Sequence, residues 1–414
     1  MASDTEVTRA DIEAARTRIA GHVRPTPLVV SAALGELVGH PVYLKCENLQ
    51  RTGSFKVRGA HNMLAVRGPS AVVTASAGNH AQGVALASRE RGVQATVVMP
   101  RTAPLAKQRA ARGYGAEIVL VEGGLAEAIE HARGLAAAHG WLFVPPFDAP
   151  EVVAGQGTIG LELLEELPEL ATVVVPAGGG GLLGGIALAV KSSRPDVRVV
   201  GVQSAAMPGL IASRVAGEPV AVARARTIAD GVAVVGPSAL TQALIERYVD
   251  DLVAVSEADI ASAVVFLVER ARLVVEGAGA LAVAALRAGL VRPSGPVVAV
   301  VSGGNIDASL LGRLVQRGLA VDGRQRRLTI AAANVPGELA RITAVCSAQG
   351  ANIIEVGHDL TPPELPVGVA RITLRLELAG AEAYAALEAA FIEAGFVAGT
   401  ATDLLTPAAA ESKF

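Results

Sequence analysis

The sequence predicts an α/β protein. Parallel sheets covered by helices should fill roughly the first 320 residues, and a smaller ferredoxin-like βαββαβ unit should follow. Two observations support this fold class. Short strands rich in Val and Ile alternate with helical segments, a pattern typical of parallel strands buried on both faces. Near residue 323 the order becomes strand, helix, strand, strand, helix, strand, which is the order of the split βαβ unit.

The first element expected is a helix over residues 8–21, because Thr8 and Asp11 are spaced for a capping box. Strands are then expected over residues 41–46, 71–75, 95–99, 116–121, 141–144, 171–176, 197–203, 251–255 and 296–301. Helices lie between most of these strands and include residues 125–139, 182–192, 257–272 and 306–318. Ser256 and Asp259 mark the start of the third of these helices.

The C-terminal unit is assigned in the same way. Its strands are expected over residues 326–335, 351–360, 367–378 and 396–404. Its helices are expected over residues 336–350 and 381–395, with Pro336 in the first turn of the earlier one. We therefore expect a main domain over residues 1–320, a linker over 321–327, a C-terminal domain over 328–405 and a tail over 406–414.

The composition excludes several classes of protein. Of the 414 residues, 51% are hydrophobic and 18% are charged, which is far from a disordered chain. The net charge is −3 and there is no basic stripe, so nucleic acid is not expected as a partner. The apolar surface favours a homodimer or homotetramer. We expect no membrane contact and a cytoplasmic location. The first residues lead us to expect no signal peptide. The sequence has no apolar run of ~20 residues, and its two cysteines, Cys46 and Cys346, lie far apart.

Four consecutive glycines stand between the strand at 171–176 and the helix at 182–192. Without Cβ atoms, their backbone N–H groups can converge on an anion at a helix N-terminus, and phosphate is the natural ligand. A plain strand-to-helix turn is the simpler alternative, but it does not need four glycines. This tetraglycine loop consists of Gly178, Gly179, Gly180 and Gly181.

The same loop also contains a dinucleotide-binding pattern. Gly179, Gly181 and Gly184 satisfy G-x-G-x-x-G. That site requires an acidic residue about 20 positions later, at the end of the next strand, where this chain has the neutral Gln203. A nicotinamide dehydrogenase is therefore disfavoured. A phosphate site without a ribose site fits a compact phosphorylated cofactor.

Lys56 belongs to the segment TGSFKVRGA, residues 52–60, and stands early in an expected helix. The positive end of a helix disfavours an ammonium group, so the pKa of Lys56 should be lowered. A lowered pKa is what a Schiff-base amine requires. If this segment is considered alone, the simpler interpretation is that Lys56 is a solvated lysine at the start of a helix. The other motifs favour a catalytic role for Lys56.

Two polar loops follow strands in the same way. The loop after strand 71–75 opens a helix, where backbone N–H groups can hold a carboxylate. In this 76–80 loop, His80 is either a general base or, more commonly for such a residue, a cap. The loop after strand 296–301 has the sequence SGGN and places Ser302 over the crevice where α/β folds bind ligands.

With these four motifs in order over roughly residues 8–320, the sequence resembles the fold-type II family of pyridoxal-phosphate (PLP) enzymes. The most similar branch is that of threonine dehydratase (threonine ammonia-lyase) and serine racemase. The resemblance implies a tryptophan-synthase-β-like fold. A small subdomain near residues 50–148 is inserted in a large one formed by 1–49 and 149–320, and PLP lies between them.

The resemblance also implies a role for each site residue. Lys56 would form the Schiff base with PLP. The implied cofactor contacts are Phe55 beside the ring, Asn79 at the phenolic oxygen, Ser302 at the pyridine nitrogen, and Gly178, Gly179, Gly180, Gly181 and Leu182 around the phosphate. The substrate carboxylate would lie on Ser76, Ala77, Gly78, Asn79 and His80.

The reaction expected from these residues is β-elimination. A hydroxyl such as that of Ser302 leaves the pyridine nitrogen largely unprotonated, which favours loss of a β-substituent over transamination. The expected activity is conversion of L-threonine, and also L-serine, to a 2-oxo acid and ammonia, giving 2-oxobutanoate from threonine. The alternatives are an ammonia-lyase for hydroxyaspartate, phenylserine or serine, and a catalytically silent sensor.

The sequence departs from the pattern of the racemases in two places, and these departures bear on racemase activity and on the need for a metal. Racemases of this branch have a second serine where this chain has Ala77, so racemisation should be poor. Their metal ligands align with Gln203, Met207 and Gly209, so no required divalent metal is expected. Asp230 and Glu276 stand in loops near the site and are interpreted as structural caps.

The C-terminal unit resembles an ACT regulatory domain, with the motif NVPGEL at residues 334–339. The resemblance implies an isoleucine or valine effector bound at this strand-to-helix loop, and a role in isoleucine biosynthesis. The alternative is a unit that serves only dimerisation.

Overall fold

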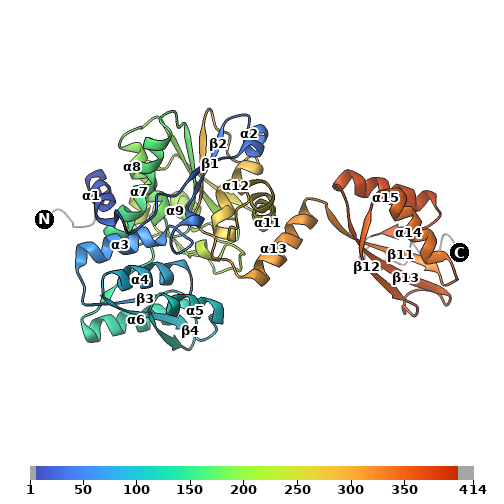
Figure 1. Cartoon of the computed structure of the whole chain (residues 1–414), viewed down its shortest axis with the longest axis horizontal. Coiled ribbons are helices and arrows are strands. Elements are labelled where there is room, and N and C mark those ends of the chain that lie inside the picture. The colour runs from blue at the N-terminus through green and yellow to red at the C-terminus, as the bar shows by residue number, and fades with distance from the viewer. Residues whose placement is uncertain (1–5, 400–414) are drawn as a thin grey trace. The chain divides into compact units, whose positions relative to one another are not determined.

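The computed structural model describes residues 6–399 (Figure 1). The chain forms two compact units that divide between Leu311 and Gly312. None of the helices in the described part is both long enough and apolar enough to cross a membrane.

The larger unit contains a six-stranded sheet in the order β1-β2-β10-β7-β8-β9. Its strands are β1 Leu28–Val30, β2 Val42–Cys46, β10 Val297–Val301, β7 Thr172–Pro176, β8 Arg198–Ser204 and β9 Asp251–Val255. All neighbours are parallel except β1, which pairs antiparallel with β2. Every residue of β7 and β10 is buried, which is why these strands are continuous apolar runs. The sequence analysis did not predict β1, which has only three residues.

A second, four-stranded sheet has the order β5-β4-β3-β6 and is wholly parallel. Its strands are β5 Glu117–Val121, β4 Gln94–Pro100, β3 Ala71–Ala75 and β6 Leu142–Phe143. Figure 1 shows β3 and β4 of this sheet among helices α4, α5 and α6. Because strands β2 to β10 fall within one or two residues of their expected positions, the parallel α/β architecture predicted from the sequence is confirmed.

The helices of this unit are α1 Arg9–Ile19, α2 Ala32–Val38, α3 Lys56–Arg67, α4 Asn79–Glu90, α5 Leu105–Gly113, α6 Leu125–His139, α7 Pro150–Glu166, α8 Gly181–Lys191, α9 Gly209–Ala216, α10 Ala239–Tyr248, α11 Glu257–Phe266 and α12 Leu281–Arg287. The next helix, α13 Ala308–Val321, contains the boundary between the two units. The capping box predicted at Thr8 is present. The helix start predicted at Ser256 is also confirmed, and Ser256 forms a capping box there with Asp259. The helix expected over 257–272 ends earlier, because α11 passes into a π-helical turn at Leu267–Ala271.

Helices α3, α7 and α8 pack closely through small residues. A Cβ atom at Gly155 of α7 would lie 2.6 Å from the Cα of Gly59 in α3, and one at Gly185 of α8 would lie 2.5 Å from the carbonyl oxygen of Val153 in α7. Side chains at these positions would push the helices apart. This close approach fixes the position of α3, which begins at Lys56.

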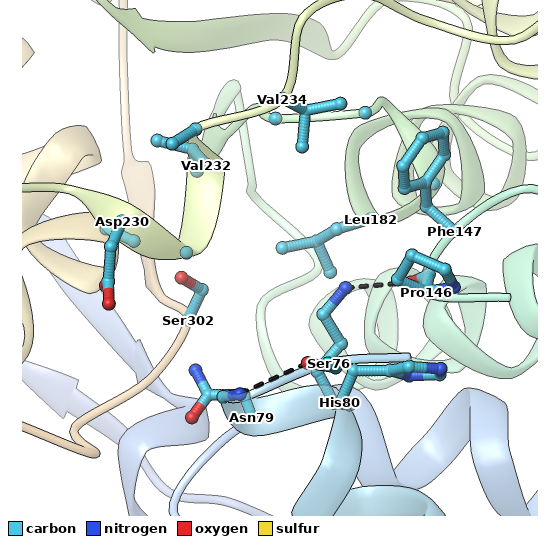
Figure 2. A pocket seen from close by; sticks show the side chains of 18 of the residues that line it. Ser76, Asn79, His80, Pro146, Phe147, Leu182, Asp230, Val232, Val234 and Ser302 are labelled. Atoms are coloured by element: carbon cyan, nitrogen blue, oxygen red, sulfur yellow. Dashed lines mark hydrogen bonds between the residues drawn. The ribbon is translucent and has the colours of Figure 1, made fainter. Parts of the chain in front are cut away.

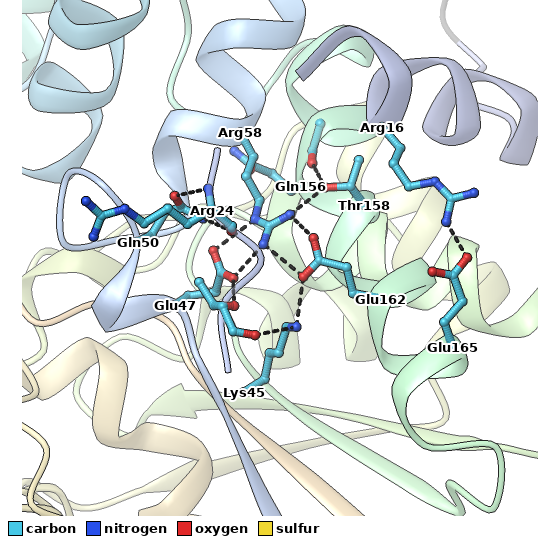
Figure 3. A network of polar contacts seen from close by, with 12 residues as sticks. Arg16, Arg24, Lys45, Glu47, Gln50, Arg58, Gln156, Thr158, Glu162 and Glu165 are labelled. Carbon is cyan, nitrogen blue, oxygen red and sulfur yellow. Dashed lines mark hydrogen bonds and ion pairs between the residues drawn. The ribbon is translucent and has the colours of Figure 1, made fainter. Parts of the chain in front are cut away.

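A buried ionic network holds the start of α3 (Figure 3). Arg58 Nε and Nη2 donate to the two carboxylate oxygens of Glu47 at 2.9 and 2.8 Å, and both side chains are fully buried. Arg58 also pairs with Glu162 of α7, which in turn lies 2.8 Å from Lys45 Nζ. Because each buried charge has an opposite partner, the network ties α3 to β2 and α7 at a point two residues from Lys56.

The C-terminal unit contains β11 Gln325–Ala333, α14 Glu338–Ala348, β12 Asn352–Asp359, β13 Val369–Glu377, α15 Ala381–Glu393 and β14 Val397–Gly399. Its sheet has the order β12-β13-β11-β14 with antiparallel neighbours. Leu328, Ile330, Leu374 and Phe391 are buried in its core. The predicted ferredoxin-like βαββαβ order is therefore confirmed.

Three details of this unit differ from the sequence analysis. Pro336 lies before α14 and not in its first turn, because Gly337, with a φ of 94°, is the residue that precedes the helix. The predicted linker at 321–327 includes the last residue of α13 and the first three of β11. Residues 400–404 of the last predicted strand and the predicted tail at 406–414 lie outside the described residues.

Candidate functional site

One cavity of about 310 Å³ brings the predicted motifs together (Figure 2). It lies at the carboxyl ends of β3, β7 and β10 and at the N-terminal ends of α3, α4 and α8. Every site residue named from the sequence lines it: Phe55, Lys56, Ser76, Ala77, Gly78, Asn79, His80, Gly178, Gly179, Gly180, Gly181, Leu182 and Ser302. The ends of parallel strands are where α/β folds place their ligand sites.

Lys56 is the first residue of α3, and its partly buried side chain lines this cavity. Its Nζ atom donates to the carbonyl oxygen of Pro146 at 2.8 Å and lies 5.1 Å from the ring centroid of Phe55. Burial lowers the pKa of Lys56 to about 8, and the nearby Glu276 carboxylate opposes this shift. The lowered pKa agrees with the sequence prediction, but its main cause is burial and not the helix end.

The tetraglycine loop runs from the end of β7 into α8, which begins at Gly181. A Cβ atom at Gly179 would lie 2.5 Å from the ring of Phe147, and Gly180 has a φ of 94°, which favours glycine. The loop thus has no room for side chains, and its backbone approaches the cavity directly. Such a loop at a helix N-terminus fits the phosphate of a cofactor.

Asn79, the first residue of α4, stands in a chain of side-chain hydrogen bonds. Its Nδ2 donates to Glu276 Oε1 at 2.6 Å, and its Oδ1 accepts from Asn305 Nδ2 at 2.8 Å. Asn305 also donates to the carbonyl oxygen of Thr52 at 2.6 Å. These bonds fix the orientation of the Asn79 amide at the cavity wall.

Glu276 and Asp230 both line the cavity, in agreement with the position near the site that the sequence indicated. Glu276 precedes a short 3-10 turn, Gly277–Ala280, but its side chain makes no cap hydrogen bond there, so the cap interpretation was wrong. Burial, followed by the negative charge of Asp230, raises the pKa of Glu276 to about 8. Asp230 itself pairs with Lys107 at 2.6 Å. The contact between Glu276 and Asn79 joins residues far apart in sequence, and no local pattern could have indicated it.

His80 is buried, and its Nε2 lies 2.9 Å from the carbonyl oxygen of Val144. Burial, followed by the charge of Lys56, lowers the pKa of His80 to about 3. A neutral imidazole that donates to Val144 ties α4 to the residue after β6. This arrangement favours the structural interpretation of His80 over a general base.

Ser302 follows β10 directly and is almost fully buried. Its carbonyl oxygen accepts from the backbone N–H of Phe55 at 3.2 Å, and the neighbouring Gly303 forms an isolated antiparallel bridge with Ser54. The SGGN loop and the segment that carries Lys56 are therefore held side by side by backbone contacts.

Gln203, Met207 and Gly209, the positions expected to align with the metal ligands of the racemases, have structural contacts in this protein. Gln203 Oε1 accepts hydrogen bonds from the backbone N–H groups of Leu210 and Ile211, both at 3.0 Å, and so caps the start of α9. Met207 is buried, and Gly209 is the first residue of α9. None of these three residues has a carboxylate side chain, and the one side-chain oxygen among them, Gln203 Oε1, is occupied by two backbone N–H groups, so the positions offer a divalent metal no anionic ligand.

Comparison with known proteins agrees with this site. Residues 19–303 match the family described as pyridoxal-phosphate dependent enzyme. An L-threonine ammonia-lyase of Thermotoga maritima is 44% identical over 394 residues, which are 94% of this chain and 98% of that protein. A catabolic L-threonine dehydratase of Escherichia coli is 43% identical over 318 residues, 75% of this chain and 97% of that protein.

A solved structure, that of T.th. threonine deaminase, superposes with a TM-score of 0.70 at 40% sequence identity. The superposition covers 72% of this chain and 99% of the other. The matched family model spans more than half of the chain, and one relative aligns over nearly all of it. The chain therefore belongs to the fold-type II family of pyridoxal-phosphate dependent enzymes.

Proposed function

We propose that the chain is an L-threonine ammonia-lyase that converts L-threonine to 2-oxobutanoate and ammonia and also acts on L-serine. The observation that carries the proposal is the Lys56 amine, which lies in one cavity with the tetraglycine loop, Asn79 and Ser302. The names of the Thermotoga maritima and Escherichia coli relatives support the same substrate.

The cavity fits pyridoxal phosphate. The tetraglycine loop and Leu182 would hold the phosphate through backbone N–H groups, because a Cβ at Gly179 would fill the space beside Phe147. Phe55 would flank the ring, Asn79 would donate to its phenolic oxygen, and the Ser302 hydroxyl would bond its nitrogen. When bound through Lys56, the cofactor supplies an electron-withdrawing ring that accepts electrons from the substrate Cα.

Lys56 would move the proton in the first chemical step. An amine with a pKa of about 8 is neutral in a useful fraction of molecules near neutral pH, so it can take the Cα proton of the substrate. The 76–80 loop at the N-terminus of α4 would hold the substrate carboxylate and orient Cα toward Nζ. The methyl group of Ala77 cannot carry a proton at the position where racemases of this branch have their second serine, which favours elimination over racemisation.

Ser302 would select elimination over transamination. A serine hydroxyl has no charge with which to keep a ring nitrogen protonated, whereas a carboxylate would do so. The side chain of Ser302 is nearly excluded from bulk water, so its hydroxyl would have a fixed partner once the cofactor is in place.

The C-terminal unit is proposed to be an ACT-like regulatory domain over residues 328–405, linked to the catalytic domain 1–320, with isoleucine or valine as effector and a role in isoleucine biosynthesis. Two observations support this. The first is the βαββαβ order of the unit. The second is the length of the alignments: the Thermotoga maritima relative aligns over 94% of this chain, whereas the catabolic relative of Escherichia coli aligns over only 75%. Exposed apolar residues Ile354 and Val356 on β12 favour pairing between copies in a homodimer or homotetramer.

A cytoplasmic location is proposed from the cysteines. Both Cys46 and Cys346 are free and buried, and burial raises the pKa of each thiol. Free thiols in a chain of this length are typical of a reducing compartment.

Release of oxo acid from a panel of amino acids tests the proposed activity. We expect the purified holoenzyme to act on L-threonine with the highest kcat/KM, on L-serine less well, and on hydroxyaspartate and phenylserine poorly. Repeating the assay with isoleucine and valine tests the effector. A kcat/KM for threonine ten times below that of another substrate would overturn the choice of substrate. A holoenzyme that releases no oxo acid from any of them would indicate a sensor.

A further inference from the structure

A second cluster of potential ligands lies outside the cavity, where three segments of the larger unit meet. His22 stands in the loop after α1, His61 on α3, and Glu90 is the last residue of α4. One ligand atom from each residue can be chosen so that all lie within 4.8 Å of one another. His22 Nδ1 is 3.0 Å and His61 Nε2 is 3.4 Å from the same oxygen, Glu90 Oε2.

His61 is the feature of this cluster that needs an explanation. Its side chain is fully buried, yet neither ring nitrogen has a hydrogen-bond partner among the described residues. Leaving a buried polar group without a partner costs about 1–3 kcal/mol, so such groups in proteins usually meet a water, an ion or a ligand. The unpartnered Nε2 of His61 faces the Glu90 carboxylate, and the ring stacks on that of His22 with centroids 4.8 Å apart.

We infer that His22, His61 and Glu90 form a binding site for a divalent transition metal ion of the Zn²⁺ class. Two imidazoles and one carboxylate are a ligand set that Zn²⁺ takes in proteins, with a fourth position left to water. Zn–N bonds of about 2.0–2.1 Å require donor atoms roughly 3.4 Å apart. The two distances to Glu90 already fit, so only the ring nitrogens of His22 and His61, which lie within 4.8 Å of each other, have to approach. His22 can supply this movement, because it stands in a loop and its side chain is 36% exposed.

A metal ion could reach the cluster, because its three residues are not equally buried. The side chain of His61 is fully buried, whereas those of His22 and Glu90 are 36% and 20% exposed. The exposed part of His22 gives the ion access from solvent.

Two arginines set the expected affinity. Arg51 forms an ion pair with the other oxygen of Glu90, Oε1, and leaves Oε2 toward the imidazoles. The charge of Arg91 is also felt at His61. Both cations repel a metal ion, so binding should be weaker than at a closed structural zinc site. The site would connect the middle of α3 to the C-terminal end of α4. The first residues of these helices, Lys56 and Asn79, line the cavity.

The test is metal binding to the full-length, tag-free holoenzyme, with Co²⁺ and Zn²⁺ as probes. We expect one Co²⁺ per chain with a visible ligand-field spectrum, displacement of Co²⁺ by Zn²⁺, which favours four-coordinate sites of imidazole and carboxylate, and a thermal midpoint that rises with Zn²⁺ concentration. His22→Gln and Glu90→Gln should each weaken binding at least tenfold. His358→Gln, a change of an exposed histidine on β12, should leave it unchanged.

His61→Ala is the most direct variant but removes a buried side chain, so its failure to fold would decide nothing. His22 is partly exposed, and the His22→Gln variant therefore keeps the test decisive. If the wild-type protein binds neither ion, or if His22→Gln and Glu90→Gln bind as well as wild type, the site does not exist. Metal binding and the thermal midpoint are measured without oxo-acid release, so the metal site can fail while the proposed activity holds, and the reverse.

Discussion

Asn79 Nδ2 donates a 2.6 Å hydrogen bond to Glu276 Oε1, although the two residues are 197 positions apart in sequence. The bond places a buried carboxyl group with a pKa of about 8 directly beside the residue proposed to contact the cofactor oxygen. Glu276 is therefore protonated in the folded protein at pH values where an unfolded chain would have ionised it. This difference has a measurable consequence for stability.

Replacing Glu276 by Gln should remove the pH dependence of stability that this group causes. Between pH of about 4.5 and 8 the folded state holds a proton that the unfolded state has lost, so wild-type stability falls as pH rises. Glu276→Gln keeps an oxygen to accept from Asn79 and has no such proton. From pH 5 to pH 8, the free energy of unfolding of the variant should therefore rise relative to that of wild type by about a few kcal/mol. Denaturant unfolding at each pH measures this difference. Parallel pH profiles of the two proteins would contradict the assignment.

Lys56 should control both activity and cofactor attachment. Lys56→Ala should lower kcat by about 10³-fold or more, because the variant loses the proposed general base. In wild type, borohydride should fix the cofactor to the peptide that contains Lys56, as mass spectrometry can show, and Lys56→Ala should give no fixed label. A label on another lysine, such as Lys45 or Lys107, would refute the assignment.

The sequence predicted the site residues because each motif follows a strand and opens a helix or a loop. The carboxyl ends of parallel strands meet at one edge of a sheet, so the tetraglycine loop after β7 and the Ser302 loop after the neighbouring β10 must come together. The 76–80 loop follows β3 of the other sheet, and strand order alone does not bring it to them. The contacts behind them could not be predicted. The bonds of Glu276 to Asn79 and of Arg58 to Glu47 depend on tertiary packing, and the three-residue β1 is too short to show an alternating pattern. The same holds for the π-helical turn after α11, which hydrophobic periodicity does not distinguish from continued α-helix.

The tetraglycine loop should not tolerate a methyl group. Gly179→Ala would place a Cβ 2.5 Å from the ring of Phe147, so we expect the loop to shift, with a loss of about 1–3 kcal/mol in stability and a weaker hold on the cofactor. Equilibrium dialysis of PLP and denaturant unfolding measure the two effects. Gly134→Ala is the matched control. That glycine is exposed in α6 and has nothing within 4 Å of its Cβ position, so the variant should be as stable as wild type or up to about 1 kcal/mol more stable.

Arg58 should be far more important for stability than an exposed arginine. Arg58→Met would leave the fully buried Glu47 carboxylate without its cation, which costs about 3–5 kcal/mol. Arg16→Ala, which removes an exposed pair with Glu165, should cost less than about 1 kcal/mol. Urea unfolding of the two variants compares them directly. Equal losses would show that the buried network contributes no more than a surface ion pair.

Ala77 should limit the enzyme to elimination. Its side chain lines the cavity on the loop that is proposed to hold the substrate carboxylate, and a methyl group cannot carry a proton. Ala77→Ser adds one hydroxyl in the position where racemases of this branch have a second serine, so the variant should form D-serine from L-serine at a rate well above that of wild type. Chiral chromatography of the amino acid left after partial turnover measures both products. Gly78 is the neighbouring control: Gly78→Ser adds a hydroxyl one residue away, where the Cβ would meet nothing within 4 Å, and should not racemise serine. If Ala77→Ser eliminates as wild type does and forms no D-serine, the absence of a second proton carrier at this position does not explain the choice of reaction.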